Sequence, residues 1–367
     1  MIRARFRDFD WVLLGFVLVL SVISVLEIRS ATAMTKFHGF QQKQILFLAT
    51  GLVLMFAISL VDYHRLLDIA YWAYGVGVFS LVAVRLVGQK VLGGRRWINL
   101  GGGVHFQPSE WVKLVLILAM ARFFWERVGE GRSLRWGDIG KAFLLIGFPL
   151  FMVLKQPDLG TSLTYIPILV AGLFLGGIRL KHAAILVLGV LLVGGIGWST
   201  GKLLKPYQRA RVTAFINPDS DPKGSGYQVR QSLIAVGSGG IWGKGTNKGT
   251  QTQGDFLPIP YTDFIFAAFC EEHGFIGAIG VLLLYFLILV RLIQNAQTAP
   301  DPPGTLIIMG VMAVTLFQVG INIGMCVGFM PVTGIPLPLM SYGGSSIIFT
   351  FLALGIVMNI RMRRFVN

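Results

Sequence analysis

Long apolar runs recur along almost the whole chain, and they limit the fold more than any other feature of the sequence. A helix needs about 20 mainly apolar residues to cross the hydrocarbon core of a bilayer. Ten runs approach that length, over residues 10–29, 45–61, 69–87, 109–126, 139–154, 162–178, 183–199, 263–291, 305–329 and 343–360. The sequence therefore predicts an all-α polytopic membrane protein with about ten transmembrane helices.

The composition supports this class of protein. The 367 residues are 54% hydrophobic and only 13% charged, with a net charge of +15. Basic residues are spread between the apolar runs and form no basic-aromatic module, which favours membrane phosphate over nucleic acid as the anionic partner. Cys270 and Cys326 lie within apolar runs without metal or disulfide spacing, so we expect both in the core. The first run has no small-residue cleavage site, so we expect a retained helix.

The short connections indicate the orientation in the membrane. Their basic residues form four groups: Arg3, Arg5 and Arg7; Arg122, Arg127, Arg132, Arg135 and Lys141; Arg179 and Lys181; Arg361, Arg363 and Arg364. Ten spans place all four groups on one side, which the positive-inside rule assigns to the cytoplasm. We therefore expect a single transmembrane domain, residues 1–367, with both termini cytoplasmic. The longest extracytoplasmic loop would be about 200–262, between the seventh and eighth spans.

Carboxylates interrupt the apolar sequence within residues 253–277. Asp263 lies where a polar, proline-broken segment meets the eighth run, and Glu271 and Glu272 follow within that run. An ionisable group at a membrane helix is costly, so each is a candidate functional residue.

Residues 93–114 bring together a second set of polar groups. Arg95 and Arg96 are adjacent, and a guanidinium group suits phosphate oxygens. Gln107 precedes Pro108 and Ser109 as a candidate helix cap. Glu110 and Lys113 are three residues apart, within pairing distance on a helix. A structural ion pair and a substrate-binding role are both open for this pair.

Two further connections carry polar groups between apolar spans. Residues 155–162 read KQPDLGTS, in which Asp158 could cap the sixth helix or bind a cation or a substrate hydroxyl. Residues 331–346 hold three prolines and three glycines, which favours a re-entrant, cavity-lining loop. Ser341 and Ser345 are its candidate binding groups, and a purely structural turn is the alternative.

The loop 200–262 is strongly basic, which predicts an anionic partner or anionic head groups. Arg209 and Arg211 are candidates for binding a pyrophosphate. A helical stripe of Tyr227, Gln231 and Ile234, with Gln228 beside it, is typical of an amphipathic interfacial helix, and Gln228 and Gln231 are candidates for binding substrate. The glycine-rich segment that follows could hold phosphate with Lys244, but it matches no P-loop.

Several catalytic signatures are absent from the sequence. It has no Walker motif, no metal triad and no GxSxG elbow, and none of the five histidines has a ligand partner at metal spacing. ATP-driven transport and zinc hydrolysis are therefore disfavoured.

Taken together, these stretches resemble the SEDS family of cell-wall glycosyltransferases. The resemblance rests on QPSEWVKL, QPDLGTS, KPYQRARVTAFINPDSDP, GYQVRQSLIAVGSGGIWGKG, TDFIFAAFCEEHGFIG and INIGMCVGFMPVTGIPLPLMSYGGSS, which occur in family order. KPYQRARVTAFINPDSDP and PVTGIPLPLMSYGGSS are more similar to the elongation branch than to the division branch. The family pattern LPE-x-HTDFIF is altered, since Ile259 and Tyr261 replace its Glu and His.

The resemblance implies a function as well as a fold. Such proteins polymerise lipid II into glycan strands outside the bacterial inner membrane, for cell elongation and rod shape. They act with a class B penicillin-binding protein, which is a transpeptidase, and with MreC and MreD. Asp263 matches the essential catalytic residue, Glu110 and Lys113 match a salt-bridged pair, and Asp158 matches the acidic residue of QPDLG.

This chemistry needs a base at the incoming hydroxyl and positive charge at the leaving pyrophosphate. Asp263 is our candidate for the base, and the arginines and Lys244 for the charge. Mg²⁺ or Mn²⁺ could share that task, but the sequence shows no complete ligand set, so the cofactor stays open. A flippase for the lipid-linked precursor, a division-type polymerase and a pure scaffold are the alternatives.

Overall fold

The computed structural model describes residues 7–33, 39–91, 94–99, 101, 105–128, 134–200 and 205–364. The helices that form the bundle are α2 (Trp11–Ala31), α3 (Phe40–Leu60), α5 (Ala70–Val87), α6 (Pro108–Val128), α7 (Trp136–Lys155), α8 (Leu159–Leu163), α9 (Ile166–Leu175), α10 (Leu180–Thr200), α14 (Ile265–Gln297), α15 (Pro302–Cys326) and α16 (Gly344–Met362). The elements at its ends are α4 (Tyr63–Asp68), β1 (Gln89–Val91), β2 (Gly94–Asn99), β3 (His105–Phe106), α11 (Pro206–Ile216), the 3₁₀ turn η1 (Pro218–Ser220), α12 (Ser225–Ser238) and α13 (Thr250–Gln253).

The predicted membrane helices are confirmed as helices. Within the described residues, eight are long and apolar enough to cross a membrane. Of the other two predicted spans, α6 contains more charged residues than any of the eight apolar helices, and the sixth span has the predicted length but begins three residues earlier. It is split into α8 and α9, which together cover Leu159–Leu175. The protein is thus a multi-pass membrane protein of mainly helical fold.

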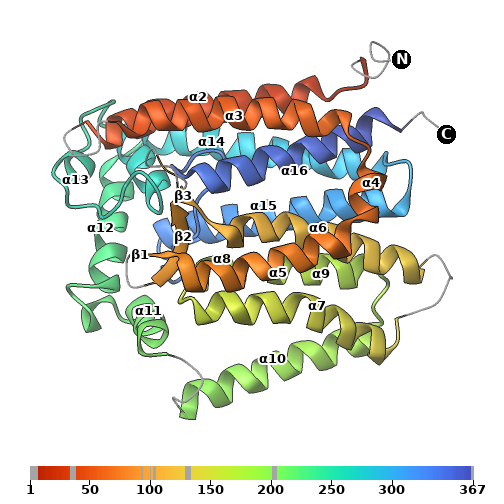
Figure 1. Cartoon of the computed structure of the whole chain (residues 1–367). Coiled ribbons are helices and arrows are strands. Elements are labelled where there is room, and N and C mark those ends of the chain that lie inside the picture. Colours follow the sequence, from red (N-terminus) through yellow and green to blue (C-terminus); the bar gives the residue numbers. More distant parts are fainter. Residues whose placement is uncertain are drawn as a thin grey trace.

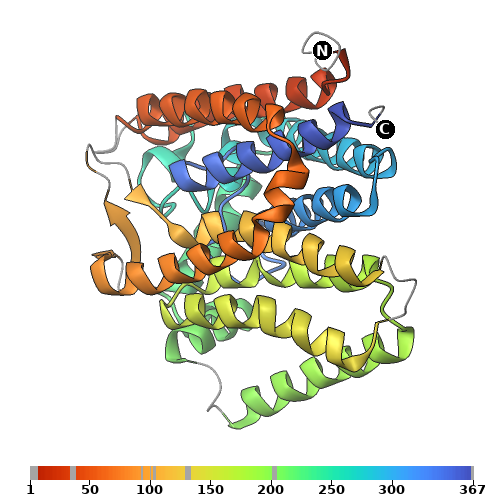
Figure 2. The ribbon, with the colours of Figure 1, turned by 45° about the vertical axis from the view of Figure 1, so that its right-hand side comes forward.

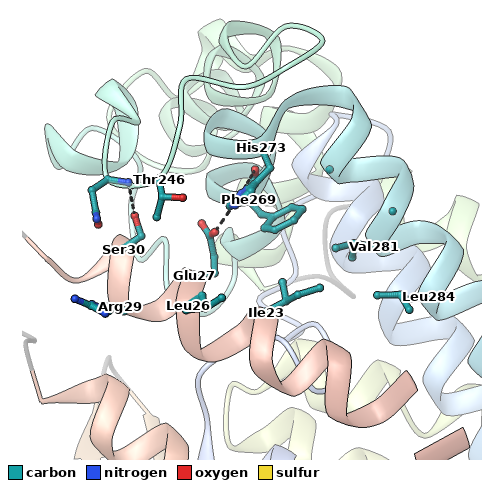
Figure 3. A pocket seen from close by; sticks show the side chains of 13 residues that line it. Ile23, Leu26, Glu27, Arg29, Ser30, Thr246, Phe269, His273, Val281 and Leu284 are labelled. Carbon is teal, nitrogen blue, oxygen red and sulfur yellow. Dashed lines mark hydrogen bonds and ion pairs between the residues drawn. The ribbon is translucent and has the colours of Figure 1, made fainter. Parts of the chain in front are cut away.

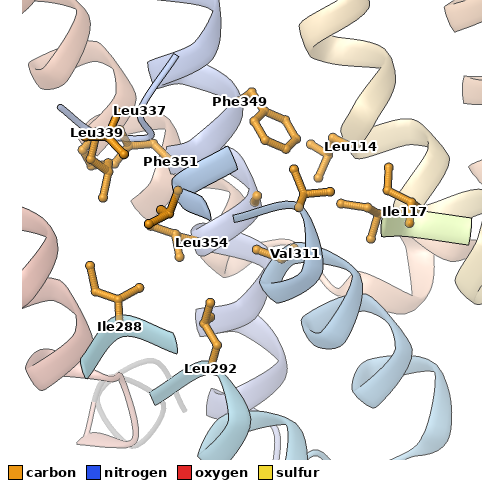
Figure 4. Close-up of a cluster of buried hydrophobic side chains, with 14 of the residues drawn as sticks. Leu114, Ile117, Ile288, Leu292, Val311, Leu337, Leu339, Phe349, Phe351 and Leu354 are labelled. Atoms are coloured by element: carbon orange, nitrogen blue, oxygen red, sulfur yellow. The ribbon is translucent and has the colours of Figure 1, made fainter. Parts of the chain in front are cut away.

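The core lies among α6, α14, α15 and α16, where apolar side chains from these helices meet (Figure 4). α16 is its central helix. In its 18-residue apolar stretch 72% of the residues are buried, whereas in that of α10 only 6% are buried. α3 packs closely on α16 through small residues. A Cβ on Gly51 would lie 2.6 Å from Phe351, and one on Gly355 would lie 2.6 Å from the Met55 carbonyl. Small residues allow this approach of two membrane helices.

Aspartates cap several helices at the ends of the bundle. Asp10, Asp62, Asp158 and Asp301 accept backbone N–H groups at the starts of α2, α4, α8 and α15. An N-cap satisfies backbone donors that have no partner in the helix. These caps explain why the helices begin where polar sequence meets an apolar run.

The two ends of the bundle are built differently (Figures 1 and 2). At one end Arg364 bonds Asp8 at 3.1 Å, which joins the end of the chain to its beginning. At the other end lie the strands, α11, α12 and α13. The described parts of the predicted extracytoplasmic connections therefore lie at one end, because successive spans cross the membrane in alternate directions.

The structure departs from the sequence predictions at this second end. The strands β1, β2 and β3 form a three-stranded antiparallel sheet in the order β1–β2–β3. The long loop contains helices, and α12 buries Gly226, Val229, Ser232 and Ala235. The predicted stripe of Tyr227, Gln231 and Ile234 is therefore not the buried face of α12, and on the buried face Ser232 Oγ donates to the Cys326 carbonyl of α15 at 2.8 Å.

Candidate functional site

Asp263 lies in the loop that leads into α14, and hydrogen bonds fix its position. Its carbonyl oxygen accepts a hydrogen bond from Asn322 Nδ2 of α15 at 3.0 Å. The neighbouring Thr262 carbonyl accepts one from Ser341 Oγ at 2.6 Å. Ser341 Oγ also accepts the Leu337 N–H at 2.8 Å. Ser341, predicted to bind substrate, thus anchors the loop that carries Asp263.

Arg211 of α11 is the cation that acts most strongly on Asp263. Burial raises the pKa of the Asp263 carboxyl above its ordinary value, and the charge of Arg211 opposes that rise. Arg211 Nη1 donates to the Thr333 carbonyl at 2.8 Å. A Cβ on the next residue, Gly334, would lie 3.4 Å from Asp263 Oδ2. Arg211, the backbone at residues 333–334 and the carboxylate therefore form one cluster.

Asp158 contributes the second carboxylate of this cluster. Its Oδ1 accepts the Thr161 N–H at 3.3 Å as the cap of α8, and its Oδ2 accepts a hydrogen bond from Gln107 Nε2 at 2.8 Å. Arg96 Nη1 lies 3.9 Å from Asp158 Oδ1. Asp158 raises the pKa of Asp263, and Arg96 lowers it. The capping role of Asp158 is confirmed, and its contact with substrate stays a prediction.

The backbone brings these connections close to each other. A Cβ on Gly160 would lie only 2.8 Å from the Thr333 carbonyl oxygen. Arg96 Nε donates to the Gln156 carbonyl at 3.2 Å, which joins β2 to the same region. Segments far apart in the sequence therefore assemble around Asp263.

Glu110 and Lys113 form a buried ion pair at the start of α6. Lys113 Nζ lies 2.7 Å from Glu110 Oε2, and both residues are buried. The ammonium also lies 4.2 Å from the centre of the Phe349 ring. Tyr165 donates its hydroxyl hydrogen to the Ser109 carbonyl at 2.9 Å, which fixes this end of α6. The geometry supports the structural interpretation, and substrate binding by the pair stays a prediction.

Ser345 and Gln107 link α16 to the start of α6. Ser345 Oγ accepts the Gln107 N–H at 3.0 Å and donates to the His105 carbonyl at 3.3 Å. Gln107 directly precedes α6, at the predicted cap position, and its carbonyl oxygen accepts the Glu110 N–H at 3.1 Å. Its amide donates to Asp158, because the connection that contains Asp158 folds against it.

Several predicted binding residues lie elsewhere. Arg95 Nη1 bonds the Arg85 carbonyl at 3.4 Å, whereas Arg96 bonds the Gln156 carbonyl, so the two guanidinium groups have different partners. Arg209 is exposed on α11. Gln228 and Gln231 are partly exposed on α12. A substrate-binding role for these residues stays a prediction.

Lys244 is engaged by a carboxylate. Its Nζ lies 2.7 Å from Glu271 Oε1 and bonds the hydroxyls of Ser238 and Thr250 at 2.7 and 2.8 Å. We predicted that Lys244 binds phosphate, but the fold places the Glu271 carboxylate against its ammonium group. We therefore leave Lys244 out of the candidate site.

Three residues of the site were not identified from the sequence as binding candidates: Gln107, Asn322 and Thr333. Asn322 is an amide within an apolar run, which is a usable signal. The Thr333 hydroxyl is buried and has no hydrogen-bond partner among the described residues. A buried polar atom of this kind is costly unless a ligand or water satisfies it.

Asp158 and Asp263 do not belong to a group of three metal-ligand side chains among the described residues. Asp158 is occupied by Gln107 and the Thr161 N–H, and Arg96 and Arg211 supply positive charge. The one group of three metal-ligand side chains within the described residues is Glu27, Glu272 and His273, which lies elsewhere.

Comparisons with known proteins identify the family. Residues 7–365 match the profile of the FtsW, RodA and SpoVE family, described as cell cycle proteins. The chain is 39% identical to peptidoglycan glycosyltransferase MrdB of Escherichia coli K12, over 97% of this chain and 94% of that protein. It is 38% identical to stage V sporulation protein E of Bacillus subtilis, over 96% of each.

Solved structures agree with this assignment. A chain in a structure described as a peptidoglycan synthase complex that coordinates polymerization and crosslinking aligns with a TM-score of 0.84. It is 33% identical over 98% of this chain and 99% of that chain. Rod shape determining protein RodA of Thermus thermophilus aligns with a TM-score of 0.72 and 30% identity, over 98% of both chains. The chain therefore belongs to the FtsW, RodA and SpoVE family, as a membrane enzyme of the peptidoglycan glycosyltransferase class and the RodA type.

Proposed function

We propose that this enzyme polymerises lipid II into β-1,4 glycan strands for cell elongation, with Asp263 as the general base. The observation that carries the proposal is the position of Asp263. It is a carboxylate of raised pKa, held beside Arg211 at the meeting point of four connections. A base is more effective when its pKa is closer to the working pH.

The proposed reaction is a single displacement with inversion. The sugar hydroxyl oxygen of the acceptor attacks the anomeric carbon of the donor, and the bond from that carbon to the lipid pyrophosphate breaks. Asp263 takes the hydroxyl proton, and the electron pair of the broken bond leaves with the pyrophosphate. Removing a proton in this way typically accelerates such a step by about 10²–10⁴-fold.

Arg211 and Arg96 are the proposed groups that stabilise the leaving pyrophosphate. Both act electrostatically on Asp263, so both charges are directed to the same region. Fixed charge at the position where negative charge develops is usually the largest contribution to catalysis. The groups around Asp263 include the Asp158 carboxylate as well as the two guanidinium groups, and a divalent cation that shares this task stays a prediction.

We propose that the end of the bundle with Asp263 faces the outside of the bacterial inner membrane. The opposite end holds the termini and the basic connections, including Arg127, Arg361 and Arg364. Positive residues in short connections favour the cytoplasm. Both termini would then be cytoplasmic.

We propose a class B penicillin-binding protein as the crosslinking partner, with MreC and MreD as further members of the elongation assembly. The support for the first is the similar chain in the peptidoglycan synthase complex. MreC and MreD follow from the resemblance to the elongation branch.

The test is polymerisation of purified lipid II by the enzyme with its class B partner in liposomes. We expect Asp263→Asn to lower the rate by at least about 10²-fold, because the base is lost. Asp255→Asn is the matched control, since Asp255 is an exposed carboxylate in the same loop and asparagine tolerates its positive φ of 57°. Polymer made at the wild-type rate by Asp263→Asn would refute the base. Movement of lipid II across the bilayer without polymer would favour the flippase.

A further inference from the structure

α14 is broken close to its start, directly after three polar residues. Gly274 has φ 65° and ψ −164°, and the polypeptide of residues 240–245 docks into the break. The Phe275 N–H donates to the Gly240 carbonyl at 2.9 Å, and the Gly245 N–H donates to the Glu272 carbonyl at 2.9 Å. This break lets polar groups lie inside a membrane helix, and the proposed polymerisation uses none of them.

Glu271 is fully paired. Its Oε1 accepts from Lys244 Nζ at 2.7 Å and from the Gln251 N–H at 2.9 Å. Its Oε2 accepts from the N–H and the hydroxyl of Thr252 at 3.0 and 2.9 Å. The next carboxylate differs, because Glu272 Oε1 accepts from Asn247 N–H at 3.1 Å while its Oε2 has no partner among the described residues.

Glu27 of α2 faces Glu272 and is also unsatisfied. Glu27 is only 1% exposed, and neither of its carboxylate oxygens has a hydrogen-bond partner in the described chain. His273 Nδ1 lies 3.7 Å from Glu27 Oε2. The ligand atoms of Glu27, Glu272 and His273 all lie within 4.8 Å of one another. Figure 3 shows the Glu27 carboxylate pointing towards His273, with Arg29 extending away from it.

A cavity of about 570 Å³ gives access to this cluster. Glu27, Ser30, Asn247 and His273 line it together with apolar side chains such as Phe269. The His273 side chain is 37% exposed, so a solute in the cavity can reach it. The cavity can also supply water molecules to a bound ion.

We propose that Glu27, Glu272 and His273 bind a divalent first-row transition-metal cation such as Mn²⁺ or Zn²⁺. Two buried carboxylates need a compensating positive charge, because an unpaired buried charge is strongly unfavourable. Carboxylates suit Mn²⁺ and imidazole suits Zn²⁺, so the mixed donor set favours these ions over Mg²⁺. Three protein ligands leave a coordination position for water from the cavity.

The neighbouring residues orient these ligands. Ser30 donates its hydroxyl hydrogen to Glu272 Oε1, and the Asn247 N–H donates to Ser30 Oγ at 3.0 Å. Gln253 Nε2 donates to the Ser30 carbonyl at 3.0 Å. Outer hydrogen bonds of this kind fix metal ligands in position. His273 Nδ1 also lies 3.3 Å from the Phe269 carbonyl oxygen, which accepts a hydrogen bond from it, so coordination by Nδ1 replaces that hydrogen bond and moves the ring hydrogen to Nε2. A bound ion would join α2 to the broken part of α14.

The experiment is Co²⁺ binding to the full chain in detergent after treatment with a chelator, followed by visible absorption. We expect one saturable Co²⁺ per chain, displaced by Zn²⁺, and a thermal transition that rises with added Mn²⁺. Glu27→Gln and Glu272→Gln should each weaken Co²⁺ binding by at least about tenfold, since each removes one ligand. Ser30→Ala should weaken it by about 10–100-fold through the orientation of Glu272.

Two variants serve as controls. Glu126→Gln removes the carboxylate that pairs with Arg122 near the end of α6, at the other end of the bundle, and should bind Co²⁺ as wild type. Asp263→Asn should also bind normally, which separates this site from the proposed catalytic residue. Absence of saturable Co²⁺ binding, or wild-type binding by Glu27→Gln, would overturn the proposal. Loss of binding in Asp263→Asn with retention in Glu27→Gln would do the same. If Glu27→Gln does not fold, Ser30→Ala and His273→Gln decide by the same comparison.

Discussion

Removing one partner of the Glu110–Lys113 pair should destabilise the protein far more than removing both. The two charges are 2.7 Å apart and buried. At an effective dielectric constant of about 20, their attraction is about 6 kcal/mol, most of which offsets the loss of hydration. Lys113→Met leaves Glu110 as an unpaired buried charge, at a cost of about 3–5 kcal/mol. Glu110→Gln combined with Lys113→Met should cost less than about 1 kcal/mol, because no buried charge remains.

Thermal unfolding in detergent measures this difference with a thiol-reactive fluorescent dye. Cys270 and Cys326 are free and buried, so they react only when the bundle opens. An unfolding entropy of about 2.1 cal/mol/K per residue gives roughly 0.8 kcal/mol/K for a chain of 367 residues. The single substitution should therefore lower the Tm by about 4–6 °C, and the double substitution should restore most of that loss.

The double variant also separates stability from catalysis. If the pair only stabilises α6, the double variant should polymerise lipid II at close to the wild-type rate. If the pair also positions substrate, stability should recover while the rate stays low. A double variant as unstable as Lys113→Met alone would refute the view that an unpaired charge causes the loss.

Three further substitutions test the site and the broken helix. Asp263 acts as a base only when deprotonated, so the polymerisation rate should fall as the pH drops through its pKa. Arg211 lowers that pKa, so Arg211→Gln should raise it and move the acid side of the pH–rate profile to higher pH. Gly160→Ala brings a Cβ within 2.8 Å of the Thr333 carbonyl oxygen and should lower the polymerisation rate by about 10²-fold through displacement of that loop, with a smaller effect on the Tm. Gly274→Ala places a side chain at φ 65° and 2.3 Å from a backbone nitrogen, which should cost at least about 1–3 kcal/mol and lower the Tm in the same dye assay.

The membrane helices could be predicted because their signal is local. An apolar run of sufficient length is helical in a bilayer whatever its neighbours are, since backbone groups must be satisfied within the segment. The sixth span was the least regular, because Asp158 caps a short helix and the chain then bends before α9. The strands of residues 89–106 were missed, because short strands among glycines carry little periodicity.

The contacts of the site depend on distant segments and could not be predicted. Asp263 was identifiable as a carboxylate at the edge of an apolar run, but its neighbour Arg211 is more than 50 residues away along the chain. Lys244 looked like a phosphate ligand because Glu271 was not known to face it. His273 had no ligand partner in the sequence, because Glu27 comes from the first membrane helix.

The proposed cation site and Asp263 lie at opposite ends of one buried segment. All residues from Phe264 to Glu272 are buried, so this first part of α14 is held on every side by close packing. At 1.5 Å per residue, eight or nine helical residues separate Glu272 from Asp263 by roughly 12 Å. A cation on Glu272 is therefore too far away to contact the reacting atoms, and its influence on catalysis would be mechanical. Close-packed segments transmit displacement, so an ion that fixes α2 to Glu272 would also fix the start of α14 and the loop that holds the base.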